Sequence, residues 1–132
     1  MMRVWLVLGA ANGLLSVAAG AFGAHALKGN LSEKMLTVFE TAARYQMYHA
    51  LALLAVGWMA SQTSSRRIHV AGWAFSIGIV LFSGSLYALA LSGVGAFGAI
   101  TPLGGVGFLV GWASLLWSAL VIHRPSTTAP IS

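Results

Sequence analysis

Four apolar stretches, each comparable in length to the thickness of a lipid bilayer, constrain this chain more than any short motif. They run over residues of about 4–27, 45–60, 70–92 and 102–122. A membrane-spanning helix needs about 20 predominantly apolar residues, and inside the bilayer a helix satisfies its own backbone hydrogen bonds. The sequence therefore predicts an all-α fold, an integral membrane four-helix bundle. The second stretch is short for a span unless its helix begins earlier.

The composition supports a membrane setting. Hydrophobic residues make up 58% of the 132 residues and charged residues 7%, and a soluble domain of this size cannot bury so much apolar surface. The net charge is +5, but the basic residues are scattered and flank the apolar stretches, as at the water boundaries of membrane proteins. Nucleic-acid binding is therefore not expected. The absence of cysteine excludes disulfides and thiolate metal sites, and no metal site is predicted.

Residues 1–124 are predicted to form a single membrane domain, and residues 125–132, which are polar and contain proline, a loose tail. Thr101 and Pro102 have the pattern of a helix start, with threonine as N-cap and proline at the first helical position.

Residues 31–44 differ from the rest of the chain because apolar and polar residues alternate there with helical spacing. The apolar positions are Leu31, Met35, Val38, Phe39 and Ala42. This pattern predicts an amphipathic helix that lies at the membrane interface between spans 1 and 2 and runs into span 2. Asn30 and Glu33 have the spacing of a capping box at its start.

Small residues recur four apart on the predicted spans. In a bilayer, helix association depends on close backbone approach, which small residues permit. The predicted helix-packing positions are Gly9, Gly13, Gly72, Ser76, Gly84, Gly107 and Gly111. We expect most of them to serve packing within one chain. An interface of a homo-oligomer is the alternative.

Polar side chains gather where the amphipathic segment enters the second span. This predicted polar cluster consists of His25, Glu40, Arg44, Tyr45, Gln46, Tyr48 and His49, with His25 at the end of the first span on the same membrane side. Glu40 precedes Arg44 by four residues, so the two can pair along one helix face. Asn12 lies near the middle of the first span, where an unpaired amide is costly.

Four interpretations of this cluster stay open. The first is structural, with Glu40 and Arg44 paired at the interface and the other groups satisfied between helices. The second is a pocket for a lipid headgroup, a quinone or another small ligand, with Arg44, Gln46, Tyr48 and His49 as donors. The third is haem held by His25 and His49. The fourth is proton, ion or small-solute transport past Glu40 and His49, although no polar relay continues into the later spans.

Two motifs, "GAFGAHAL" at the end of the first span and "FETAARYQMYHALALL" into the second, resemble a family of small membrane proteins. This is the YgdD-like family, catalogued as domain of unknown function 423 and related to the eukaryotic transmembrane protein 256. The positions that carry the resemblance are Gly20, Phe22, Gly23, His25, Ala26, Leu27, Phe39, Ala42, Arg44, Tyr45, Gln46, Tyr48, His49 and Ala50. The resemblance implies a multi-pass protein of the bacterial inner (plasma) membrane, and it supplies no activity or cofactor.

The sequence contains no catalytic motif, so no enzymatic activity and no cofactor are predicted. The leading expectation is a structural or accessory membrane protein surrounded by lipids, or a small subunit of a larger membrane complex. With four spans, Arg3, Arg66, Arg67 and Arg124 share one side, against Lys28, Lys34 and Arg44 on the other. The excess of positive charge predicts that both termini face the cytoplasm.

Overall fold

A computed structural model describes residues 1–122, which fold into four α-helices and one short 3-10 helix. They are α1 (Met2–His25), α2 (Glu33–Gln62), α3 (Arg66–Ser92), η1 (Gly95–Ala99) and α4 (Thr101–Val121). The all-α prediction is confirmed. His123, Arg124 and the tail predicted for residues 125–132 lie outside the described residues.

Three segments are long and apolar enough to cross a membrane: Met2–His25, Arg66–Ser92 and Gly95–Val121. The fourth helix, α2, contains 30 residues and is therefore about 45 Å long, but its first third is polar on one face. The predicted interfacial helix is not a separate element, because residues 33–44 and the second apolar stretch belong to this one continuous helix. The physical reason is that residues 33–56 contain neither glycine nor proline.

Both predicted helix caps were wrong. The side chain of Ser32, not Asn30, caps α2 by accepting a hydrogen bond from the Met35 amide at 3.2 Å. Asn30 instead donates to the Ala26 carbonyl at 2.8 Å and closes the turn after α1. Thr101 is already inside α4, and its hydroxyl contacts the Ser85 hydroxyl of α3 at 2.6 Å, so it joins two helices instead of capping one.

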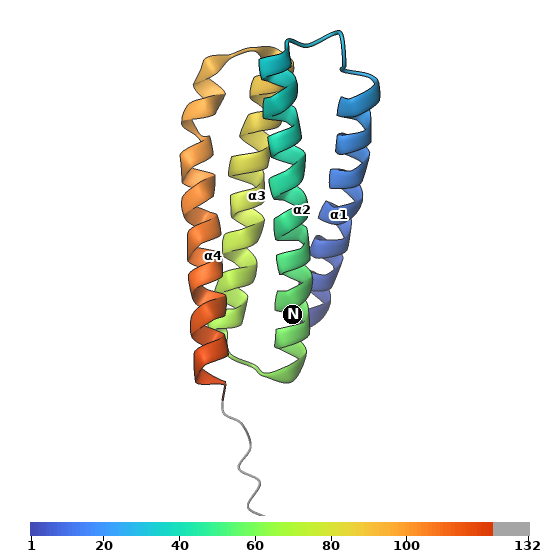
Figure 1. Cartoon of the computed structure of the whole chain (residues 1–132). Helices are drawn as coiled ribbons and strands as arrows, with labels where there is room; N and C mark the ends of the chain where they lie inside the picture. Colours follow the sequence, from blue (N-terminus) through green and yellow to red (C-terminus); the bar gives the residue numbers. More distant parts are fainter. Residues whose placement is uncertain (123–132) are drawn as a thin grey trace, which may run out of the picture.

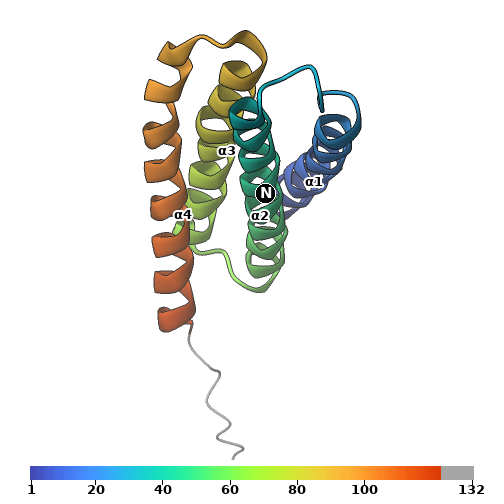
Figure 2. The ribbon, with the colours of Figure 1, turned by 45° about the horizontal axis from the view of Figure 1, so that its top comes forward.

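The helices stand side by side in chain order, as an open bundle (Figures 1 and 2). Consecutive helices run antiparallel and pack on each other, α1 on α2, α2 on α3 and α3 on α4. The edge helices α1 and α4 lie far apart. Because the row does not close, a groove runs between α1 and α3 and another between α2 and α4.

Glycines set the distances between these helices. A Cβ atom at Gly72 would lie 2.6 Å from the Trp5 ring, and one at Gly104 would collide with the backbone of Phe82. Large side chains fill the remaining space, and the core contains Trp5, Leu53, Val56, Ile68, Phe75 and Phe108. The helices of this chain are therefore held by close backbone approach around a few large side chains.

The predicted packing positions divide into two groups. Tight contacts between helices occur at Gly9, Gly72, Gly107 and Gly111. The Ser76 hydroxyl bonds within its own helix, to the Gly72 carbonyl at 2.8 Å. Gly13 and Gly84 face open space, so no helix contact forms there. Tight contacts that the sequence analysis did not single out occur at Gly23, Gly57, Gly78 and Gly104.

Candidate functional site

The polar residues of α2 point in three different directions and do not form one cluster. Gln46 faces α1 and α3, whereas His49 faces α4. Glu40, Arg44 and Tyr48 lie on the outer surface of α2. These residues are close in sequence because they share one helix. They point to different sides of it because their angular positions about the helix axis differ.

Gln46 joins three helices through a chain of hydrogen bonds. Its side-chain nitrogen donates to the Asn12 oxygen on α1 at 3.0 Å, and its oxygen accepts from the Tyr87 hydroxyl on α3 at 2.8 Å. The Asn12 nitrogen donates in turn to the Leu8 carbonyl at 2.9 Å. The intramembrane amide of Asn12 is thus satisfied by partners within the chain.

Two serines attach the neighbouring helices to the backbone of α2. The Ser16 hydroxyl of α1 donates to the Ala43 carbonyl at 2.6 Å, and the Ser83 hydroxyl of α3 donates to the Ala42 carbonyl at 2.8 Å. Sequence reasoning did not single out Ser83 or Tyr87. Both are polar residues inside an apolar span, and that signal could have marked them.

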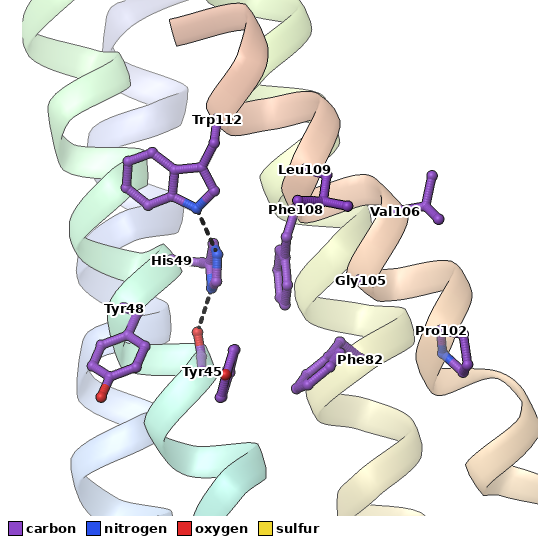
Figure 3. Close-up of a pocket in the computed structure, with 10 residues that line it drawn as sticks. All are labelled: Tyr45, Tyr48, His49, Phe82, Pro102, Gly105, Val106, Phe108, Leu109 and Trp112. Carbon is purple, nitrogen blue, oxygen red and sulfur yellow. Dashed lines mark hydrogen bonds between the residues drawn. The ribbon is translucent and has the colours of Figure 1, made fainter. Parts of the chain in front are cut away.

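Both ring nitrogens of His49 are engaged (Figure 3). Nδ1 lies 2.7 Å from the Tyr45 carbonyl, and Nε2 lies 3.1 Å from the indole nitrogen of Trp112 on α4. A carbonyl only accepts and an indole N–H only donates. His49 is therefore neutral, with its proton on Nδ1, and it links α2 to α4.

Aromatic rings surround His49 and line the groove between α2 and α4. The imidazole stacks on Phe108 with ring centroids 3.5 Å apart and an angle of 4° between the planes. Tyr45 packs against Phe82 with centroids 4.8 Å apart. The resulting α2–α4 groove has a volume of about 610 Å³ and is lined by Tyr45, Tyr48, His49, Phe82, Pro102, Gly105, Val106, Phe108, Leu109 and Trp112 (Figure 3).

The structure does not bring His25 and His49 together as a haem site would require. Gly9 of α1 contacts Ala50, and Gly23 contacts Phe39, so His25 lies at the level of about residue 37 of α2. This level is roughly twelve residues from His49, or about 18 Å along the helix axis. Among residues 1–122, no group of three or more His, Asp or Glu residues is placed to hold a metal ion.

Arg44 and Glu40 lie in a shallow groove on the outer face of α1 and α2, together with Tyr48. Within residues 1–122 the expected ion pair between Glu40 and Arg44 is not formed. Both side chains are exposed, and Tyr48 lines this outer groove as well as the α2–α4 groove. The basic group is thus available at the rim of an aromatic surface.

A second tryptophan–histidine pair lies at the opposite end of the helices. The fully buried Trp5 of α1 donates to Nδ1 of His69 on α3 at 3.0 Å. Nearby, the Arg67 guanidinium lies 5.2 Å from the ring centroid of Trp117 on α4, a cation–π contact.

Trp112→Phe is expected to lower the free energy of unfolding by about 1–2 kcal/mol, because Nε2 of His49 loses its donor while staying buried. Unfolding of the purified protein in mixed micelles, followed by circular dichroism, measures the change. Trp58→Phe is the matched control: that ring is 64% exposed, so the same substitution should change stability by less than about 0.5 kcal/mol. Equal effects of the two substitutions would contradict a structural role of the Trp112–His49 bond.

Comparison with known proteins identifies relatives but no activity. Residues 19–105 match the family described as "Protein of unknown function (DUF423)". The chain is 51% identical to a UPF0382 membrane protein of Staphylococcus epidermidis, over 90% of this chain and 97% of the relative. It is 53% identical to one of Staphylococcus saprophyticus, over 87% and 95%, and 48% identical to YwdK of Bacillus subtilis, over 90% and 98%. No solved structure matches significantly.

Proposed function

The chain belongs to the DUF423 family of membrane proteins of unknown function, and from this premise we propose that it is a non-enzymatic accessory protein that crosses the bacterial plasma membrane four times. The resemblance noted in the sequence is thereby confirmed. Its relatives carry the name membrane protein, and three segments of the chain are long and apolar enough to span a bilayer.

The position of α2 supports the fourth span. This helix packs between α1 and α3 and runs antiparallel to both along nearly the same axis, so it extends through the same depth of the membrane. The lower part of its outer surface is apolar, with Leu51 and Trp58 more than half exposed. Such a surface suits contact with lipid. Only the two ends of α2 have the character of a water-facing helix, with Glu33, Lys34 and Thr37 exposed at the first and Ser61 and Gln62 at the second.

The observation that carries the accessory role is that the buried polar groups already form hydrogen bonds within the chain, several of which join neighbouring helices. Within the described residues, no buried side-chain nitrogen or oxygen lacks a hydrogen-bond partner. Catalysis or proton transfer needs buried groups that can change partners, and both nitrogens of His49 and both polar atoms of the Gln46 amide are occupied. The polar residues therefore serve architecture better than they serve transport.

The accessory role is tested by gentle solubilisation of native membranes, native electrophoresis and mass spectrometry of cross-linked neighbours. The expected result is an assembly of defined stoichiometry larger than this chain. Vesicles that contain the purified protein should show no proton or ion flux. A flux abolished by His49→Ala but kept in Trp58→Phe would overturn the proposal in favour of transport.

Four spans require that the α1–α2 and α3–α4 connections lie on one side and the α2–α3 connection on the other. The chain contains no cysteine, so single introduced cysteines report their own location. Asn30→Cys and Val94→Cys should react with an impermeant maleimide added outside intact cells, and Ser64→Cys only after the membrane is opened. This outcome places the termini in the cytoplasm, as the distribution of arginines predicts. Equal labelling of Asn30→Cys and Ser64→Cys from outside would refute the four-span arrangement.

A further inference from the structure

We propose that the α2–α4 groove holds one hydrocarbon chain of an anionic membrane lipid whose headgroup pairs with Arg44. This inference goes beyond the accessory role, because it assigns a bound ligand. It stands on three features: the shape of the groove, the occupied polar atoms at its floor and the cation at its rim.

The groove exists because α4 docks on α3 and not on α2. Close backbone contacts at Gly104 and Gly107 hold α4 against α3, and α2 reaches α4 mainly through the Trp112–His49 bond and the stacking of His49 on Phe108. The groove extends along α4 from Pro102 to Trp112, ten residues or about 15 Å. A volume of about 610 Å³ over this length suits an extended alkyl chain.

The walls favour hydrocarbon over a polar ring. Apolar and aromatic side chains form nearly the whole lining, and the one buried polar group on it, His49, already uses both nitrogens. A quinone head would find no free donor at the buried floor for its carbonyl oxygens, because the hydroxyls of Tyr45 and Tyr48 stand at the rim. An alkyl chain needs none, and it covers rings that would otherwise meet disordered lipid.

The rim offers what an anionic headgroup needs. Arg44 is exposed, and the tyrosine between it and the groove, Tyr48, lines both surfaces. The hydroxyls of Tyr45 and Tyr48 have no hydrogen-bond partner within the described part of the chain. Ala42 of α2 accepts a hydrogen bond from Ser83 of α3, and Gly104 of α4 contacts Phe82, so Arg44 lies near the level of the first turn of α4. The cation therefore stands at the end of the groove that opens toward the headgroups.

Glu40 lines the same outer groove one helix turn before Arg44. Its negative charge would repel an anionic headgroup bound there. The charges that a headgroup would meet are therefore one cation and one carboxylate. Since the carboxylate weakens the attraction, Glu40→Gln should strengthen anionic lipid binding. A purely apolar role for the groove predicts no effect of this substitution.

The test is native mass spectrometry of the full-length protein from nanodiscs made of phosphatidylglycerol and phosphatidylcholine with identical acyl chains. The expected result is one retained lipid per chain, with phosphatidylglycerol preferred. Arg44→Gln should lower this preference about fivefold, which corresponds to the attraction between one basic residue and an anionic membrane surface. Retention of both lipids through their acyl chains should persist. Glu40→Gln should raise the preference.

Gly105→Leu tests the groove itself. A Cβ atom at Gly105 meets nothing within 4 Å and this residue lines the groove, so a leucine there fills the space without disturbing helix contacts. Retention of both lipids should be lost. Gly84→Leu is the matched control, because it also faces open space inside a helix but lies outside the groove, and retention should persist.

Several outcomes would overturn the inference. These are retention that Gly105→Leu leaves unchanged, a preference that Arg44→Gln leaves unchanged, or a neutral quinone as the molecule retained from native membranes. A dimer that Gly105→Leu dissociates would show that a second copy covers the groove instead. None of these outcomes bears on the accessory role, which depends on the native assembly and on the absence of flux.

Discussion

Gly104→Leu is expected to detach α4 from α3 and to lower the free energy of unfolding by about 3 kcal/mol or more. A Cβ atom at this position would lie 2.7 Å from the Cα atom of Phe82 and would also collide with its amide nitrogen. Backbone atoms cannot move aside as a flexible side chain can, so the helices must separate. Denaturant titration in mixed micelles, followed through the tryptophan fluorescence of the protein, measures the loss.

Gly105→Leu is the control for this substitution, with the same change at the adjacent residue. Its Cβ atom faces open space, so its stability should equal or slightly exceed that of the wild type, because glycine is a poor helix former. Equal destabilisation at positions 104 and 105 would mean that helix propensity or hydrophobicity, and not close approach to Phe82, sets the effect. The same control shows that the variant used to fill the α2–α4 groove is folded.

Gln46→Leu is expected to destabilise the protein by about 2 kcal/mol, because it leaves the Asn12 oxygen and the Tyr87 hydroxyl without partners. The effect comes from the orphaned groups more than from the lost bonds. The triple variant Asn12→Leu, Gln46→Leu, Tyr87→Phe removes every member of the network. It should therefore recover most of the lost stability, as measured in the same titration.

Gln62→Leu makes the identical substitution at the exposed end of α2, where the side chain bonds only to Ser61. Its expected effect is below about 0.5 kcal/mol. If the triple variant were less stable than Gln46→Leu alone, the network would contribute more than the satisfaction of its own polar groups. The explanation of the Gln46→Leu effect by orphaned polar groups would then be wrong.

The segment that matches the family includes Gln46 and leaves out Trp112. The family match covers residues 19–105, which include the whole of α2 and of α3, the helices that carry Gln46, His49, Ser83 and Tyr87. Trp112 lies beyond that range, so the bond from α4 to His49 falls outside the matched segment. Stability measurements on Gln46 therefore test a residue inside the matched segment, and those on Trp112 test one outside it.

Much of the local structure was predictable from the sequence. The length of the apolar stretches determines the number and type of helices, because a backbone within a bilayer has to bond to itself. The polar positions on α2 were likewise visible, since so few polar residues interrupt the apolar runs. The exact helix starts were not, because Ser32 and Asn30 are both good caps and the geometry of the turn at Gly29, with φ of 91°, decides between them.

The sequence by itself thus determined an all-helical membrane protein and the positions of the polar residues on α2. Only the tertiary structure decided where they point: Gln46 toward α1 and α3, His49 toward α4, and Arg44 outward. The physical reason is that helix periodicity sets angles between side chains on one helix, whereas the neighbour that each face meets depends on close approach at glycines such as Gly72 and Gly104. Those contacts join distant parts of the chain, and no local pattern encodes them.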